Sequence, residues 1–167
     1  MNLLFDFTVD KTAATVHVTR EFAADLDLVW DAWTKAEILD LWWAPKPCRA
    51  QTKEMDFREG GHWRYAMIIP QNDTVWCLVD FTKIEAKSAF SAKHSFTDEN
   101  GKGSNPVLPG SRWKNSFKPG AGITTVEIVI KHENPSNLEK HIELGFKEGF
   151  TMGLGNLDEY LLTKSKK

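Results

Sequence analysis

Histidine and cysteine are the residue types in this sequence that could bind a metal ion or act as a nucleophile. The five histidines form neither an HxxxH nor an HExxH pattern, and Cys48 and Cys77 form no CxxC pair, so the spacing predicts no metal site. Cys77 lies in the apolar segment VWCLV, which is typical of a buried, inert thiol. No Gly-x-Ser-x-Gly, P-loop or Gly-x-Gly-x-x-Gly motif occurs. We therefore predict two free thiols and no cofactor.

Charged side chains close to apolar strand segments could supply an acid or a base. Asp80 lies between apolar neighbours in CLVDFTK. Glu54, Asp56 and Arg58 cluster just before a Gly-Gly turn. A carboxyl group whose pKa is raised by burial can transfer protons. The simpler interpretation is that each charge points outward from its strand, so we predict no catalytic residue and leave enzymatic activity open.

Composition and charge exclude several classes of protein. The 167 residues fit one domain, and 41% hydrophobic with 26% charged residues is ordinary for a soluble chain with a core. The formal net charge of −2 gives no electrostatic basis for binding nucleic acid. Apolar runs are too short to span a bilayer, and no basic stretch precedes an apolar one at the N-terminus. We expect a cytoplasmic protein without nucleic-acid partners or membrane insertion.

Aromatic residues are unusually numerous, with seven tryptophans, ten phenylalanines and two tyrosines. Large aromatic side chains often fill a core. Several of them at strand spacing would also suit the wall of an apolar pocket. Both interpretations stay open at this level.

The elements that must position these residues follow from hydrophobic periodicity. Alternation predicts strands, and helical spacing of apolar residues predicts helices. The predicted order is one strand, two short helices, about six antiparallel strands and one long C-terminal helix. The strands are expected at 14–22, 48–57, 62–69, 74–85, 88–96, 111–118 and 123–132, and the helices at 23–34, 36–43 and 133–164. Because a single helix cannot bury its apolar stripe alone, the last helix must lie across a curved sheet.

The predicted C-terminal helix contains four glycines, at positions 145, 149, 153 and 155. Each glycine inside a helix costs roughly 1 kcal/mol relative to alanine, so their presence needs a reason. We expect Gly145, Gly149 and Gly153 to let the helix backbone approach the sheet, or to leave room for something between them. A glycine face that packs in a homodimer is the alternative. Ser136 or Asn137 is the expected N-cap.

Three segments resemble one known family. The opening of the activator-of-heat-shock-protein-90-ATPase homologue family is similar to VTREFAADLDLVWDAWTKAEILDLWWAP. Its strand–Gly-Gly–strand signature resembles MDFREGGHWRYAM, and its closing helix resembles GFTMGLGNLDEYLL, with Phe150 where tryptophan is more usual. The resemblance, from about Val16 to Leu162, implies one START-like (SRPBCC) domain over 1–167. The implied fold is the α+β helix grip, in which a curved seven-stranded antiparallel sheet wraps around a long C-terminal helix, with two short helices after the first strand.

The same resemblance implies a cavity between sheet and long helix that binds a small hydrophobic or amphipathic ligand. It does not fix an activity, because the superfamily includes carriers, enzymes and chaperone activators. One alternative is a cofactor-free enzyme of the cyclase or hydrolase kind in the same cavity. The other is an interaction module that activates the ATPase of heat-shock protein 90. Binding to that chaperone and homodimer formation are both left open.

The side chains expected to line this cavity come from predicted strand faces and from the long helix. Trp113, Asn115 and Phe117 share one face of their strand. The predicted pocket residues are Trp63, Tyr65, Met67, Trp113, Phe117, Val126, Ile128, Phe146, Phe150 and Leu154. The alternative is that these side chains fill the space completely and form a solid core.

Overall fold

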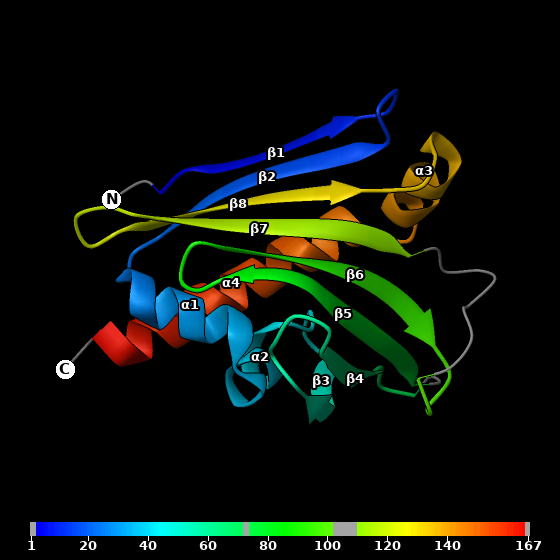
Figure 1. Cartoon of the computed structure of the whole chain (residues 1–167), viewed down its shortest axis with the longest axis horizontal. Coiled ribbons are helices and arrows are strands. Elements are labelled where there is room, and N and C mark those ends of the chain that lie inside the picture. The colour runs from blue at the N-terminus through cyan, green and yellow to red at the C-terminus, as the bar shows by residue number, and fades with distance from the viewer. Residues whose placement is uncertain (1–2, 72–73, 102–109, 166–167) are drawn as a thin grey trace.

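One curved antiparallel sheet wraps over a long C-terminal helix (Figure 1). The computed structural model describes residues 3–71, 74–101 and 110–165. The strands are β1 (Phe5–Asp10), β2 (Thr15–Phe22), β3 (Arg49–Met55), β4 (His62–Ile68), β5 (Val75–Glu85), β6 (Ala89–Thr97), β7 (Ser111–Pro119) and β8 (Thr124–Lys131). The helices are α1 (Leu26–Thr34), α2 (Ala36–Trp42), α3 (Pro135–Glu143) and α4 (Phe146–Ser165).

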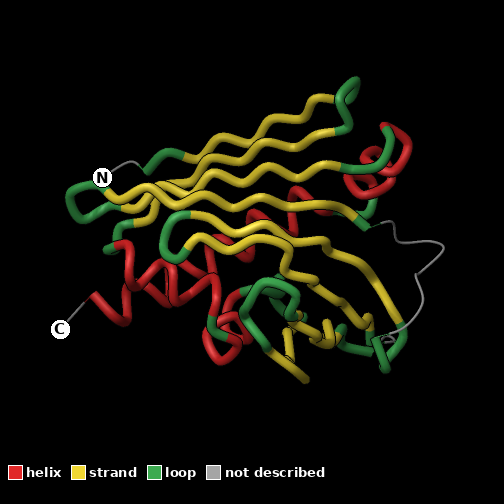
Figure 2. The backbone as a smooth tube through the Cα atoms, viewed as in Figure 1, coloured by secondary structure: helices red, strands yellow, loops and turns green. Residues whose placement is uncertain are grey.

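The strand order pairs an early strand of the chain with the last strand. It is β1-β2-β8-β7-β6-β5-β4-β3, so β2 pairs with β8 although most of the chain lies between them. Figure 2 shows the strands as one continuous layer with the helices gathered against it. Helices α1 and α2 pack near the C-terminal part of α4, and α3 lies at the opposite end of the sheet (Figure 1). This arrangement confirms the predicted α+β helix-grip class.

The sheet has eight strands, so the predicted number of seven is wrong. The additional strand is β1, which pairs with β2 along its whole length and forms an edge of the sheet. Its sequence FDFTVD does alternate, with Phe5, Phe7 and Val9 separated by polar residues. Most of β1 is nonetheless exposed, and only Phe7 is partly buried against the core. An edge strand needs little burial. Hydrophobic periodicity therefore did not predict β1.

The predicted single C-terminal helix is divided in two at Gly145. Gly145 has a φ of +91°, a conformation that residues with a side chain rarely adopt. Its N–H donates to the carbonyl of Ile142, which closes α3, and its own carbonyl accepts from Gly149 as α4 begins. The N-cap of α3 is Asn134, whose side chain accepts from the N–H of Asn137 at 2.8 Å, so the expectation of Ser136 or Asn137 is wrong.

Gly149 and Gly153 in α4 face the end of α2 and the segment after it, and not the sheet. The prediction that these glycines let the helix approach the sheet is therefore wrong. A Cβ atom at Gly153 would lie 3.2 Å from the carbonyl oxygen of Trp43 and 3.4 Å from that of Trp42. A Cβ at Gly149 would meet the ring of Pro45 at 3.6 Å. Gly155 has nothing within 4 Å. The close approach of α4 to a polypeptide backbone, at Gly153 above all, therefore requires the absent side chain.

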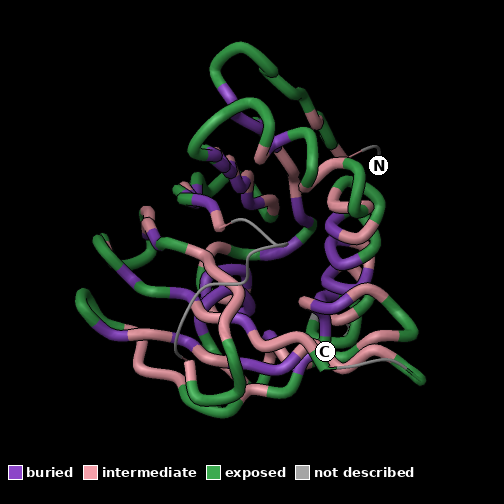
Figure 3. The backbone as a smooth tube through the Cα atoms, turned by 90° about the vertical axis from the view of Figure 1, so that its right-hand side faces the viewer, coloured by how far each residue is buried: buried purple, intermediate pink, exposed green. Residues whose placement is uncertain are grey.

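The core has two regions of different chemistry. Figure 3 shows buried and exposed positions alternating along the strands, with exposed turns at their ends. The aliphatic region lies where β2 pairs with β8, and its members are Val16, Val18, Val126, Ile128 and Ile130, all 0–1% exposed. The aromatic region lies between β4–β7 and the helices, and its members are Trp33, Trp42, Trp43, Trp63, Phe81, Phe90, Trp113, Phe117 and Phe150. The candidate site lies within the aromatic region.

Candidate ligand-binding cavity

A small enclosed cavity lies between the sheet and helices α1 and α2. Its volume is about 20 Å³, which is room for one water-sized group. The wall is contributed by α1, α2, the residue after α2, and strands β4 to β7. The lining residues are Trp33, Leu39, Trp43, Trp63, Val79, Phe81, Phe90, His94 and Asn115. The cavity is therefore mostly aromatic, with a few polar atoms in its wall.

The ring of Trp43 lies between strand residues and Phe150 of α4, in the region where a cavity between sheet and α4 was predicted. It follows α2 directly and is half-buried. Its Nε1 donates to the hydroxyl of Tyr65 at 2.7 Å. The neighbouring ring centroids lie 5.3–6.2 Å away and belong to Trp33, Trp42, Trp63, His94, Trp113 and Phe150. The Trp43 ring thus contacts helices α1, α2 and α4 and strands β4, β6 and β7.

Helix α4 holds the backbone on both sides of this ring. The side-chain amide of Asn156 donates to the carbonyl of Ala44 at 3.1 Å and to that of Trp42 at 3.4 Å. Asn156 is buried, so these bonds satisfy carbonyls that would otherwise be desolvated. Together with the close contact at Gly153, they fix the backbone that carries Trp43. The Trp43 side chain itself is held by a single hydrogen bond.

Two buried polar atoms in the cavity wall lack hydrogen-bond partners among the described residues. They are Nε1 of Trp33, a donor, and Oδ1 of Asn115, an acceptor. Trp33 is 4% exposed and Asn115 is 2% exposed. By contrast, an oxygen accepts the indole N–H of Trp42, Trp43, Trp63 and Trp113. Leaving a buried polar group unpaired costs about 1–3 kcal/mol, so each of these two atoms would be stabilised by a hydrogen-bond partner.

His94 completes this part of the wall, which we call the polar corner (Trp33, His94 and Asn115). Its ring stacks on that of Trp113, with centroids 4.2 Å apart and planes 15° apart. Burial lowers the pKa of His94 to about 3, and the nearby His141 adds to this effect. The imidazole is therefore neutral at pH 7. No lysine, arginine, aspartate or glutamate is among the described lining residues, so the cavity carries no formal charge.

Two titratable groups next to the cavity, Cys77 and Tyr65, have pKa values raised by burial. Burial raises the pKa of the Cys77 thiol to about 12, and burial also raises the pKa of the adjacent Tyr65 hydroxyl well above its usual value. Both groups stay protonated at neutral pH, so Cys77 is no thiolate nucleophile. Neither these groups nor His94 has a pKa close to 7, the range in which a general acid or base works best.

Comparison with known proteins places the chain in a family. The model of the family described as "Activator of Hsp90 ATPase homolog 1-like protein" matches residues 23–162. The chain belongs to this family. A comparison with curated proteins found no match.

Solved structures of bacterial proteins share the fold of this chain. A protein from Arthrobacter aurescens is 26% identical, with a TM-score of 0.88 over 95% of this chain and 91% of its own. Protein Ms6760 from Mycobacterium smegmatis is 23% identical, with a TM-score of 0.87 over 98% and 99% of the two chains. The AHSA1 protein from Silicibacter pomeroyi is 17% identical, with a TM-score of 0.72 over 90% and 99%. The START-like (SRPBCC) fold is thus shown.

Of the ten residues predicted to line the pocket, one lines the cavity, and the others lie in the core or contact the Trp43 ring. Trp63 lines the cavity. Tyr65, Trp113 and Phe150 contact the Trp43 ring, and Phe146 packs on Trp113 and Phe150. The other five are placed in the packed core, with Met67 only partly buried, and they are Met67, Phe117, Val126, Ile128 and Leu154.

The lining residues that sequence reasoning missed come from helices and strands alike. Strands β5 and β6 contribute Val79, Phe81, Phe90 and His94. Trp33 and Leu39 come from α1 and α2, which were predicted as helices but were given no role in the pocket. Trp43 was taken as the last residue of a helix, and its insertion depends on the turn at Pro45 that follows. Asn115 was placed on the correct strand face, where a buried amide between two aromatic residues is itself a signal for a functional group.

The charged residues considered in the sequence lie on the outer surface. Asp80 and Glu54 are exposed. Glu54 is 2.9 Å from Nε2 of His62 and forms an ion pair with Arg64. The hydrogen bond from His62 and the charge of Arg64 lower the pKa of Glu54. A carboxylate with a lowered pKa is a weaker base, which does not suit proton transfer at neutral pH.

The described part of the chain contains neither a cluster of metal-binding side chains nor a membrane-spanning helix. Within residues 3–71, 74–101 and 110–165, no three His, Cys, Asp or Glu side chains gather closely enough to hold a metal ion. Among these residues no helix has the length and apolar character needed to cross a membrane.

Proposed function

We propose that this chain binds a small hydrophobic or amphipathic ligand between the sheet and helices α1, α2 and α4, without a cofactor. The observation that carries the proposal is an aromatic-lined cavity with two buried, unpaired polar atoms in its wall. A mostly apolar wall with a few placed polar groups is the usual composition of a ligand site. The START-like fold supports the same position for the ligand.

The cavity of about 20 Å³ is smaller than any such ligand, so binding requires a side chain to move. Trp43 is the element best placed to do so. Its ring makes one hydrogen bond and is half-buried, whereas Trp42 is 1% exposed and Trp63 is 3% exposed. Rotating the Trp43 ring outward would join the cavity to the space beneath α4 while the backbone stays held by Asn156.

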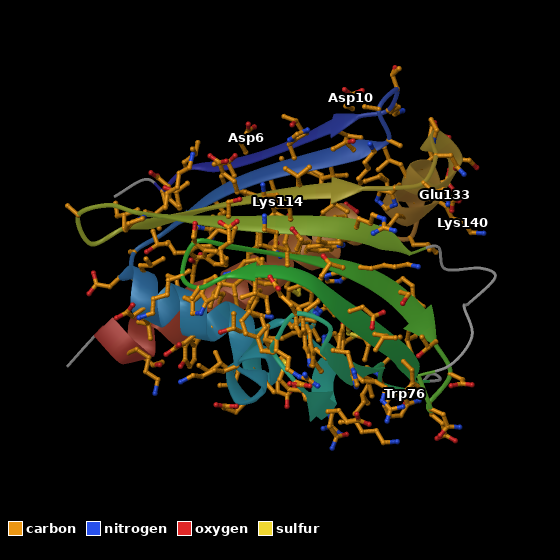
Figure 4. The ribbon with its side chains drawn as sticks, in the orientation of Figure 1. Asp6, Asp10, Trp76, Lys114, Glu133 and Lys140 are labelled. Carbon is orange, nitrogen blue, oxygen red and sulfur yellow. The ribbon has the colours of Figure 1, made fainter. Side chains whose placement is uncertain are left out.

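Native mass spectrometry of the purified chain, followed by titration with fatty acids, sterols and flavonoids, tests this proposal. We expect a one-to-one complex with at least one class, and tighter binding by Trp43→Ala, which removes the ring that must move. Trp76→Ala is the matched control, because Trp76 lies at the outer edge of the molecule under Lys53 (Figure 4). If neither the wild type nor Trp43→Ala forms a one-to-one complex with any member of the panel, the proposal is wrong.

A second candidate function is an interaction module that acts on heat-shock protein 90. A surface groove of about 390 Å³ beside α4 favours it, because it lies apart from the cavity and includes the side chain of Leu41, which is 64% exposed. Charged and polar residues complete the groove, namely Lys46, Asn156, Glu159, Tyr160, Thr163 and Lys164. The test is the ATPase rate of the chaperone with the wild type and with Leu41→Glu. Stimulation that Leu41→Glu abolishes supports this candidate, and an unchanged rate with wild type contradicts it.

A further inference from the structure

We infer that the polar corner recognises one neutral hydroxyl group of a flat aromatic ligand, so that the ligand class is phenols and aromatic alcohols and not carboxylic acids. This inference rests on the proposed function, because it names the ligand of the same cavity. Three properties of the wall support it. One unpaired atom is a donor and the other an acceptor, the lining carries no charge, and the space around Trp43 is bounded by aromatic rings.

The two unpaired atoms require opposite partners. Nε1 of Trp33 can only donate a hydrogen bond, and Oδ1 of Asn115 can only accept one. One hydroxyl group within hydrogen-bond reach of both atoms would satisfy both, since its oxygen would accept from Trp33 while its hydrogen is donated to Asn115. An ether or ketone would leave Asn115 unpaired, and a methyl group would leave both unpaired. The cavity volume of about 20 Å³ suits a group of this size.

The wall offers no counter-charge to an anion. None of its described lining residues carries a positive charge, and His94 is neutral at pH 7. Burying a carboxylate without a cation or several donors is strongly unfavourable. Trp33 supplies one unpaired donor, and the unpaired oxygen of Asn115 would face the carboxylate with its own partial negative charge. A fatty acid or other carboxylate is therefore a poor ligand for this corner.

The space next to the corner selects a flat body. The Trp43 ring, which would be displaced, lies among aromatic rings whose centroids are 5.3–6.2 Å away. Its indole N–H donates to Tyr65 at 2.7 Å. A planar aromatic ligand that replaces this ring would keep the same contacts, which are edge-to-face or tilted and favour aromatic over branched or bulky groups.

Calorimetric titration of the full chain with four probes tests the inference: 2-naphthol, 2-methylnaphthalene, 2-acetylnaphthalene and 2-naphthoate. They share one ring system and differ in the group offered to the polar corner. We expect 2-naphthol to bind about tenfold more tightly than 2-methylnaphthalene, the effect of two modest hydrogen bonds, and 2-naphthoate to bind most weakly at pH 7.

Two variants remove the unpaired atoms separately, so that a folding defect in one does not decide the result. Asn115→Leu and Trp33→Phe should each reduce the preference for 2-naphthol over 2-methylnaphthalene to about twofold or less, with folding checked by circular dichroism. Trp76→Phe, the same change as Trp33→Phe but outside the cavity, should keep the tenfold preference. A preference that survives in both cavity variants overturns the inference.

The outcomes separate this inference from the proposed function. If all four probes bind with similar affinity, or if 2-acetylnaphthalene or 2-naphthoate binds most tightly, the inference is wrong and the proposed function stands. If no probe binds to the wild type or to Trp43→Ala, the inference fails together with the claim that this cavity takes aromatic ligands. The proposed function would then depend on the fatty acids and sterols of the wider panel.

Discussion

The aliphatic and aromatic regions of the core meet on adjacent strands and differ in how their side chains pack. In the aliphatic region, branched side chains on β2 and β8 pair directly across the strands, with Val18 opposite Ile128 and Val16 opposite Ile130. In the aromatic region, flat rings pack largely edge to face at 4.9–6.2 Å. Branched side chains interlock without gaps, whereas large rings meeting at steep angles leave corners between them. We expect the first region to hold the fold together, whereas the proposed ligand binding requires the second to open.

The border between the two regions lies between β7 and β8. Asn115 on β7 is directly opposite Ile128 on β8, so a polar cavity residue and a core residue are neighbours in the sheet. One is 2% exposed with an unpaired oxygen, and the other is 1% exposed within the aliphatic region. Substitutions at these two positions therefore compare the regions with the same burial and nearly the same location.

The largest effect is expected on the aliphatic side of this pair. Ile128→Ala should reduce the free energy of unfolding by about 2–5 kcal/mol, because the closed packing cannot collapse into the space left behind. Urea denaturation monitored by circular dichroism measures it. Val129→Ala is the control, since Val129 points to the opposite face of β8 and is only partly buried, and its cost should be clearly smaller. Equal losses for the two variants would contradict the division into regions.

A smaller loss is expected where α4 approaches the segment that carries Trp43. Gly153→Val should cost about 1–3 kcal/mol, because its Cβ would press on the Trp43 carbonyl at 3.2 Å. Gly155→Ala is the matched control in the same helix, where nothing lies within 4 Å. That change should raise stability by about 0.5–1 kcal/mol, since alanine is the better helix former. If Gly153→Val proves as stable as wild type, the packing account of this glycine is wrong.

The pH dependence of stability should come from histidines beside the aromatic region. Burial lowers the pKa of His141 to about 4, and the adjacent His132 adds to this. Because the pKa in the unfolded chain is about 6.5, the unfolded state binds more protons between these values. The contribution of His141 is thus fully present above pH 6.5 and decreases as the pH falls toward 4.

Urea denaturation between pH 7 and pH 4.5 measures this slope. His141→Asn should reduce this slope without abolishing it, because His94, whose pKa burial lowers to about 3, still favours unfolding when it is protonated. His17→Asn is the matched control for the substitution, since His17 is exposed on β2. A slope that His141→Asn leaves unaltered would show that other groups dominate the acid sensitivity.

The smallest stability change is expected on the cavity side of the β7–β8 pair. Asn115→Leu removes the unpaired oxygen and adds apolar contacts of similar volume, so the free energy of unfolding should stay within about 1 kcal/mol of wild type or rise. Differential scanning calorimetry of the ligand-free chain measures it. A loss comparable to that of Ile128→Ala would mean that Asn115 is part of the rigid core and not of the cavity wall.

More of the fold than of the candidate site could be predicted from the sequence. Strands such as β4 and β8 alternate clearly, and the resemblance supplied their arrangement. The edge strand β1 and the break at Gly145 were missed because one is mostly exposed and the other depends on a single positive φ within an otherwise helical pattern. Such local features contribute little to hydrophobic periodicity.

The cavity wall was harder to predict because it depends on contacts between distant elements. Strand alternation placed Trp63 and Asn115 on inward faces, but it could not tell which inward residues meet a cavity and which meet a packed neighbour. Besides the turn at Pro45, contacts of Asn156 and Gly153 on α4 hold the backbone beside Trp43, and these come from a distant part of the sequence. No pattern local to residues 36–45 contains that information.

The most direct test of the account is an NMR titration of the seven tryptophan indole N–H signals with 2-naphthol. The account predicts saturable shifts of the Trp33 and Trp43 signals with one affinity, because Trp33 gains a partner and Trp43 leaves Tyr65, while the Trp76 signal stays in place. Assignment follows from the Trp33→Phe, Trp43→Phe and Trp76→Phe variants. Absence of shifts in Trp33 and Trp43 up to the solubility limit of the probe, or shifts of Trp76 equal to theirs, would contradict a ligand site in this cavity.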